Sequence, residues 1–168
     1  MKRCNSTGKT AIILVFLIAL LCWPVTCLIA ETGEAAAGRV VSLFPESLKM
    51  TFIHSMYHQP QTSHYVIEGN KLILKQVDFY SYDELAYFYP ETADRYKPDT
   101  DGIWRVPFNI VLEKEVIRQS HIQPYALAVN GRSYHGLDTV PGDTRLQFRL
   151  QKIPAGLAVW KCWFAGNN

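Results

Sequence analysis

Three closely spaced histidines are the first residues of this chain whose types could do chemistry. His54, His58 and His64 lie within eleven residues, and His54 and His58 share one face of a strand or of a helix. Imidazole nitrogens bind zinc and copper, so this spacing could begin a metal site. Pro60 and the polar residues around it interrupt the segment, however, and no carboxylate lies between the histidines to complete the ligands. We therefore interpret them as strand-end and turn histidines, and we predict no metal and no cofactor.

Groups for nucleophilic or acid–base catalysis occur at two places. Ser55 follows His54, but neighbouring strand residues point to opposite faces, and the chain has no Gly-x-Ser-x-Gly elbow. Asp83 and Glu84 lie in an aromatic segment, where carboxylates can have raised pKa values and work as an acid and base pair. The alternative interpretation is a pair of solvated charges in a loop. The pattern predicts no enzyme, and an exported hydrolase using this pair is a minor hypothesis.

Aromatic residues suggest a binding surface instead. Four tyrosines between residues 80 and 89 could line a groove for a sugar or an organic acid, although core or interface packing would explain them equally well. We predict two groups of binding residues, one at a strand end and one in a long loop over residues 80–102. The first group is His54, Ser55, Tyr57, His58 and Pro60, and the second is Tyr80, Tyr82, Asp83 and Glu84.

The N-terminal thirty residues predict a signal anchor. Lys2, Arg3 and Lys9 precede an uncharged, mostly apolar run over residues 10–30. The length of this run matches the ~20 residues that a helix needs to span a bilayer. Basic residues stay on the cytoplasmic side, so we expect a membrane protein with its C-terminal domain outside. The residues before Ala30 fit a cleavage site poorly, which favours an anchor over residues 1–30; secretion after cleavage is the alternative.

The rest of the chain predicts one domain. Residues 31–39 are rich in Ala, Gly and Glu and are interpreted as a spacer, and residues 40–168 are enough for one core. After residue 30 there are fifteen acidic and fourteen basic residues, so the excess of base that favours nucleic acid is missing. Cys162 is the only cysteine in this part, which excludes a disulfide within the domain, and its apolar neighbours predict a buried thiol.

The elements that would position these residues are short strands. Alternating apolar residues mark a strand over 48–52, and the runs 64–67 and 71–77 flank a Gly69-Asn70 turn. Asn130-Gly131 predicts a second hairpin, Pro141-Gly142-Asp143 another turn, and residues 146–150 alternate without a fault. Residues 157–164 can supply a last strand. We expect an all-β fold, a small antiparallel sandwich or barrel, after one N-terminal transmembrane or signal helix.

Short motifs in this domain resemble an uncharacterised bacterial domain family, domain of unknown function eighteen-fifty. The resemblance runs from about Leu48 to Gln151. The segments that carry it are Phe52-Ile53-His54-Ser55 followed by Pro60, Tyr65-Val66-Ile67, Leu72-Ile73-Leu74, Phe79-Tyr80-Ser81, Ala128-Val129-Asn130-Gly131 and Val140-Pro141-Gly142-Asp143. It implies a small protein that is exported or anchored in the bacterial cytoplasmic membrane. Family members are encoded or fused beside tripartite ATP-independent periplasmic (TRAP) transporters of the TAXI subgroup, which import organic acids. The chain departs from the family at Tyr57 and Ser63, where acidic residues are usual, and at residues 82–85, where a Gly-rich turn is usual.

These observations predict a non-enzymatic, extracytoplasmic accessory module of a membrane transport system. Its partners would be the membrane, through residues 10–30, and a transporter permease or solute-binding protein, with no nucleic acid. The second hypothesis is a small-ligand or metal-binding domain of the same system.

Overall fold

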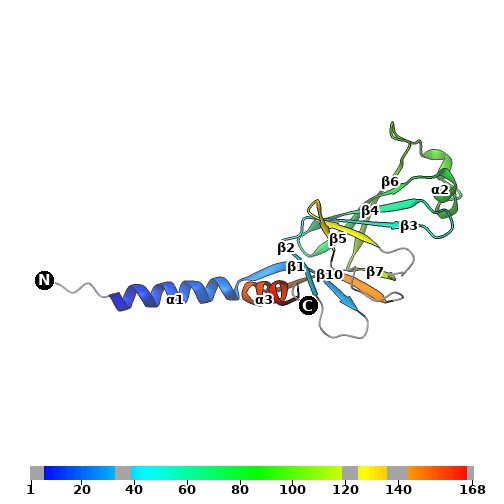
Figure 1. Ribbon diagram of the computed structural model, residues 1–168. Helices are drawn as coiled ribbons and strands as arrows, with labels where there is room; N and C mark the ends of the chain where they lie inside the picture. The colour runs from blue at the N-terminus through cyan, green and yellow to red at the C-terminus, as the bar shows by residue number, and fades with distance from the viewer. Residues whose placement is uncertain (1–5, 33–38, 119–124, 136–143, 166–168) are drawn as a thin grey trace.

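The chain folds into two packed antiparallel β-sheets with three helices around them (Figure 1). The computed structural model describes residues 6–32, 39–118, 125–135 and 144–165. Helix α1 (Ser6–Cys22) projects from one end of the sheets, and helix α2 (Tyr82–Phe88) lies at the other end. The two helices therefore mark opposite ends of an elongated molecule.

The smaller sheet has four strands in the order β2-β1-β10-β7. Its members are β1 (Pro24–Thr32), β2 (Arg39–Leu43), β7 (Lys114–Arg118) and β10 (Arg145–Pro154). The predicted alternation over residues 146–150 is confirmed, because Leu146, Phe148 and Leu150 are buried while the residues between them are half-buried.

The larger sheet has six strands in the order β6-β5-β4-β3-β8-β9. They are β3 (Ser47–Ile53), β4 (Pro60–Glu68), β5 (Lys71–Phe79), β6 (Trp104–Leu112), β8 (Ala126–Val129) and β9 (Arg132–Tyr134).

Both predicted hairpins of this sheet are present. Gly69 has φ +64° between β4 and β5, and Asn130 and Gly131 have φ +50° and +74° between β8 and β9. The side chain of Asn130 does more than turn the chain. Its Oδ1 accepts hydrogen bonds from the backbone N–H groups of Glu46 (2.8 Å) and Ser47 (3.1 Å), which fixes the start of β3.

The main core lies between the two sheets. Leu28 and Phe148 from the smaller sheet pack in one cluster with Leu48, Met50 and Tyr65 from the larger sheet. Each fully buried side chain of this size contributes about 1.5–3 kcal/mol to stability. Of the predicted sandwich or barrel, the structure confirms a mostly β fold of two antiparallel sheets, and among the described strands neither sheet closes into a barrel.

Strand β1 corrects the predicted boundaries at the N-terminus. The helix ends at Cys22, and residues 24–32 pair with β10 on one side while residues 27–30 pair with β2 on the other. Leu28 and Ala30 face the main core, whereas Val25, Cys27 and Ile29 face a second core on the opposite side of the sheet. The apolar run predicted as one membrane segment over 10–30 is thus divided, since Pro24–Ala30 is the buried strand of the domain. Glu31 and Thr32, predicted as spacer, also belong to β1.

Two segments predicted without helix are helical. Residues 82–88, expected in a loop, form α2, and residues 157–164, expected as a strand, lie in helix α3 (Ala155–Ala165). Helix α3 packs Ala158 against Val25 and Cys27, so it covers the outer face of the smaller sheet. Apolar residues at most positions of this segment gave no signal to separate a buried strand from a helix. The side chain of Cys162 and the predicted Pro141-Gly142-Asp143 turn lie outside the described residues.

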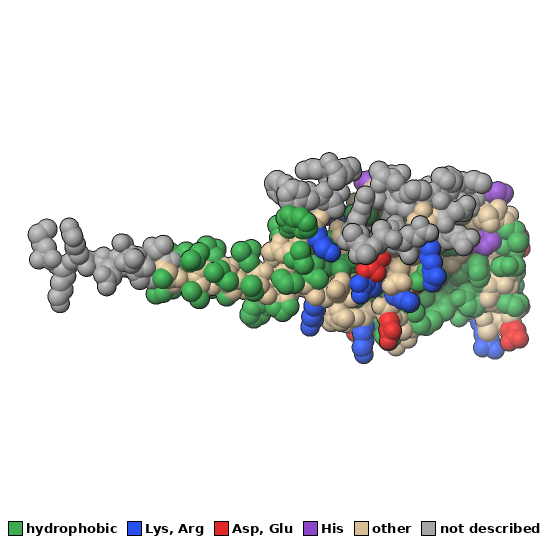
Figure 2. All heavy atoms as spheres, turned by 90° about the horizontal axis from the view of Figure 1, so that it is seen from below, with side chains coloured by type: hydrophobic (Ala, Val, Ile, Leu, Met, Phe, Trp, Pro, Cys, Tyr) green, Lys and Arg blue, Asp and Glu red, His purple; other side chains and the backbone are tan. Residues whose placement is uncertain are grey.

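Helix α1 is apolar and lies apart from the two sheets (Figure 2). Its exposed side chains include Ile12 (71% exposed) and Phe16 (63%), while Leu21 contacts α3 at Gly156. Within the part of the chain that the structure describes, no helix has both the length and the apolar character needed to cross a membrane.

Candidate binding surfaces

The turn between β3 and β4 holds His54 in a defined position. The His54 N–H donates to the carbonyl of Gln59 (2.8 Å), and the His58 N–H donates back to the carbonyl of His54 (2.8 Å). His58 has φ +53°, which closes the turn. The N–H of Met56 donates to Nδ1 of His54 (3.3 Å), so the imidazole is tied to its own loop.

Helix α2 brings a second set of side chains to the same end of the domain. Ser81 caps its start, because the Ser81 Oγ accepts a hydrogen bond from the Asp83 N–H (3.2 Å). Leu85 is fully buried and packs with Phe79 and Val106, which anchors the helix to the sheet. Tyr87 and Phe88, in contrast, are 56% and 41% exposed.

The two sets meet around the His54 ring. Its centroid lies 5.3 Å from that of Tyr57, 5.5 Å from Phe88 and 6.1 Å from Tyr87, and the Tyr87 and Phe88 rings are 5.3 Å apart. These are ordinary distances for packed aromatic pairs. We call this surface the aromatic tip; it consists of the four rings His54, Tyr57, Tyr87 and Phe88, together with Met56 of the same turn as His54. Figure 2 shows hydrophobic and histidine side chains gathered at this end, remote from α1.

An acidic segment begins on the helix that carries Tyr87 and Phe88. Residues 82–101, from α2 to the loop before β6, contain six acidic residues and two basic ones. Asp83 and Asp94 are exposed, and Asp94 accepts a hydrogen bond from the Tyr82 hydroxyl. Asp99 pairs with Arg105, the strand residue that also approaches Asp101 (3.9 Å). Asp83, four residues before Tyr87 on α2, therefore gives the aromatic tip one acidic neighbour, whereas Asp94, Asp99 and Asp101 lie toward Tyr82 and Arg105.

The structure unites only part of the predicted binding residues. His54 and Tyr57 belong to the aromatic tip, Ser55 and His58 are exposed in its turn, and Pro60 opens β4 opposite Ile53. The residues of the second predicted group lie elsewhere along the α2 segment. Tyr82 packs against Trp104 (6.3 Å between ring centroids), and Tyr80 is 36% exposed before the helix. Met56, Tyr87 and Phe88, which lie outside both predicted groups, provide the exposed surface instead. The aromatic composition of residues 80–89 was the available signal for Tyr87 and Phe88, and Met56 had none.

Asp83 and Glu84 do not form the predicted pair, since one faces solvent and the other is buried. Glu84 is fully covered, both of its carboxylate oxygens lack a hydrogen-bond partner, and burial raises its pKa to about 7. Among the described residues, no side chain therefore forms a hydrogen bond with the Glu84 carboxylate that would make it one member of an acid and base pair.

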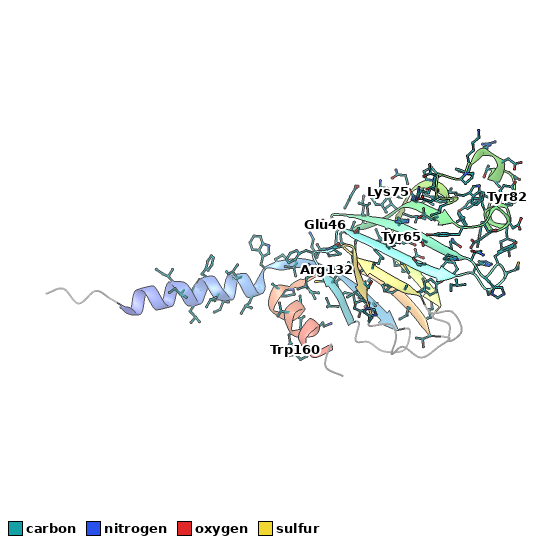
Figure 3. All side chains as sticks on the ribbon, turned by 45° about the horizontal axis from the view of Figure 1, so that its top comes forward. Glu46, Tyr65, Lys75, Tyr82, Arg132 and Trp160 are labelled. Carbon is teal, nitrogen blue, oxygen red and sulfur yellow. The ribbon has the colours of Figure 1, made fainter. Side chains whose placement is uncertain are left out.

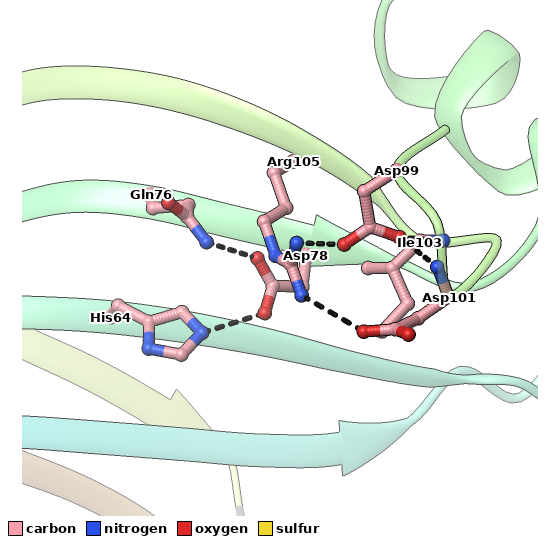
Figure 4. Close-up of polar contacts among 7 residues, drawn as sticks. All are labelled: His64, Gln76, Asp78, Asp99, Asp101, Ile103 and Arg105. Atoms are coloured by element: carbon pink, nitrogen blue, oxygen red, sulfur yellow. Dashed lines mark hydrogen bonds and ion pairs between the residues drawn. The ribbon is translucent and has the colours of Figure 1, made fainter. Parts of the chain in front are cut away.

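His64 is separated from the other two histidines by its place in a strand (Figure 4). Its Nε2 lies 2.7 Å from Oδ2 of Asp78, and Nε2 of Gln76 donates to Oδ1 of the same carboxylate (2.6 Å). Asp78 is 5% exposed, so these two neighbours provide its hydrogen bonds on the outer face of the larger sheet. Among the described residues, no group of three His, Cys, Asp or Glu side chains is arranged to hold a metal ion.

A polar cavity between the sheets escaped prediction. It has a volume of about 200 Å³ and is lined by residues of β3, β4 and β7 and by Tyr125: Met50, Phe52, Gln61, Ser63, Tyr65, Glu115, Val116, Ile117 and Tyr125. Figure 3 places Tyr65 within the body of the domain and Tyr82 at its far end. A polar residue at an inward position of an alternating strand was the signal that could have found it.

Comparison of the chain with protein-family models, with curated proteins and with solved structures gave no match. The resemblance to domain of unknown function eighteen-fifty stays a prediction from sequence motifs.

Proposed function

We propose that this protein is a non-enzymatic binding module that docks a folded protein partner on its aromatic tip. The observation that carries the proposal is the exposure of Met56 (60%), Tyr87 (56%) and Phe88 (41%) on one surface held by two anchored elements. Aromatic residues and methionine are enriched in protein interfaces, where they supply much of the binding energy.

The acidic neighbour of the aromatic tip favours one kind of partner. Exposed Asp83 lies four residues before Tyr87 on the same helix, so the complementary surface is an apolar patch with a basic side chain at one edge. Charges at the rim of an interface act mainly on the association rate and on its salt dependence. We therefore expect the complex to weaken as ionic strength rises.

The partner class belongs to the same proposal. The sequence resemblance supports a subunit of a solute transporter, a permease or a solute-binding protein, as the docked protein. The location outside the cytoplasmic membrane, with the N-terminal segment holding the module near its partner, is likewise part of this proposal. Such tethering would raise the effective concentration of the partner, so a small interface would suffice.

Co-purification with a tip variant tests the docking. We expect Met56→Ser with Tyr87→Ser to remove a specific partner from crosslinked preparations of the full chain made from its native cells. Both side chains are more than half exposed, so the fold should be retained. Phe44→Ser with Val111→Ser is the matched control, because these residues are 63% and 54% exposed at the opposite end of the larger sheet.

The captured protein is then purified and titrated against the chain. A partner lost with the tip variant, kept with the control and bound more weakly by Asp83→Lys would support the proposal. Equal recovery with the tip and control variants would contradict it.

A further inference from the structure

The cavity between the sheets contains a carboxylate where the fold calls for an apolar side chain. Glu115 lies on β7 directly opposite Phe148 on β10, and opposed residues of an antiparallel pair share one face of the sheet. Phe148 is fully buried in the main core, and Ile117, two residues after Glu115, is also buried in it. Glu115 therefore points between the sheets.

The larger sheet, which faces Glu115 across the cavity, also contributes polar side chains. Gln61 pairs with Phe52 and Ser63 pairs with Met50, at inward positions of β4 and β3. The Gln61 Oε1 is buried and has no hydrogen-bond partner, which is costly unless something in the cavity donates to it. Gln61 and Glu115 thus present acceptor oxygens to the same space.

The hydrogen bonds present in the cavity do not satisfy all of its acceptor oxygens. The Tyr65 hydroxyl donates to the Glu115 carboxylate, and burial nevertheless raises the pKa of Glu115 above its ordinary value. No Lys or Arg is among the described residues that line the cavity. A cation in the cavity would supply both the missing positive charge and the missing N–H donors.

The remaining walls are aromatic and fit the same ligand. Phe52, Tyr65 and Tyr125 line the cavity, and the Phe52 and Tyr125 ring centroids are 5.1 Å apart. Aromatic faces attract ammonium groups, most strongly where water is displaced. The volume of about 200 Å³ holds roughly six or seven waters, so the ligand is small.

We propose that the cavity between the two sheets binds a small alkylammonium ligand, with its ammonium group at Glu115 and Gln61 and its carbon chain along Phe52, Tyr65 and Tyr125. This site is separate from the aromatic tip and does not depend on the proposed protein partner.

Matched probe pairs test the proposal on the purified full chain. Ethylamine and 1,4-diaminobutane are titrated by calorimetry, with ethanol and 1,4-butanediol as neutral molecules of the same shape. We expect saturable binding of at least one amine with a Kd on the order of 1 mM or tighter, and at least tenfold weaker binding of its alcohol. Equal binding of amine and alcohol, or no saturation by either amine at about 10 mM, would overturn the proposal.

Variants locate the site. Glu115→Gln should weaken amine binding at least tenfold, whereas Glu113→Gln, an exposed glutamate just before β7, should leave it unchanged. If Glu115→Gln does not fold, Gln61→Met serves as the second variant with the same expected loss. NMR of the tyrosine rings supplies a further readout, because the amine should shift Tyr65 and Tyr125. Unchanged affinity in the folded variants would refute the site.

Discussion

At the scale of single residues, the surroundings of three acidic side chains determine how easily each one ionises. Glu84, Glu115 and Asp78 are acidic residues in three different surroundings, and each surrounding determines a different behaviour. Asp78 has two hydrogen-bonding neighbours, Glu115 has a tyrosine hydroxyl and faces a cavity, and both oxygens of Glu84 lack a hydrogen-bond partner. Glu84 therefore carries the clearest cost when it ionises.

Replacing Glu84 should change how stability depends on pH. Burial raises the pKa of Glu84 from 4.5 to about 7, so the folded protein keeps a proton that the unfolded chain releases between these values. The free energy of unfolding then falls as pH rises from about 4.5 to 7, and it stays low above that range. Glu84→Gln should remove this fall and be more stable than the parent at pH 8 by on the order of 2–3 kcal/mol.

Urea unfolding at a series of pH values measures this difference. Asp83→Asn is the matched control, since Asp83 is exposed on the same helix and should leave the pH profile as it is. Glu115, whose pKa is also raised, contributes in the same direction in all three chains and cancels in the comparison. Parallel curves for the parent and Glu84→Gln would show that Glu84 ionises freely in the fold.

Among the secondary-structure elements, strand β1 helps to hold the domain together in two ways. It pairs on both edges, with β10 and with β2, and it is buried on both faces between the main core and α3. A continuous apolar run is expected of such a strand, and it is also expected of a membrane segment, so the sequence pattern alone did not separate them.

Two truncated chains test the role of β1. A chain that starts at Trp23 keeps the strand and should unfold cooperatively, whereas a chain that starts at Glu31 should remain unfolded. The chain that starts at Glu31 lacks five buried residues of β1: Val25, Cys27, Leu28, Ile29 and Ala30. Burial of the larger ones contributes about 1.5–3 kcal/mol each, which together approaches the 5–15 kcal/mol stability of a typical domain. Circular dichroism and thermal melts measure the outcome.

The result also bears on processing of the leader. A cooperative melt from the chain that starts at Glu31 would show that β1 is dispensable and that cleavage after Ala30 is compatible with folding. The structure predicts the opposite, because such a cut removes the strand between β2 and β10.

Other elements show what the sequence could predict. Period-two alternation identified β3 and β10, and Gly and Asn at positive φ identified both hairpins, because these signals are local. Helix α3 was missed because its burial depends on β1 and β2, which are distant in sequence, and helix α2 was missed because Leu85 is buried jointly by Phe79 of the preceding strand and Val106 of β6. The same distinction applies to the aromatic tip. His54 and Tyr57 could be predicted from their residue types, but their contact with α2 could not, because it joins residues about thirty positions apart.

At the scale of the whole molecule, the two ends are different. Helix α1 projects from one end and the aromatic tip closes the other, with the two sheets and their cavity between them (Figures 1 and 2). The proposed docking surface therefore lies at the end of the domain opposite helix α1. A module tethered by that segment would hold its aromatic tip toward a partner.

Site-specific photocrosslinking tests the docking claim most directly. A photoreactive phenylalanine analogue is placed at Tyr87 in the aromatic tip or at Val111 on β6 as a control of similar exposure, and the full chain is irradiated in its native cells. The account predicts an adduct with one defined protein from position 87 and none from position 111. Irradiation that gives no adduct at position 87, or the same adducts from both positions, would contradict it.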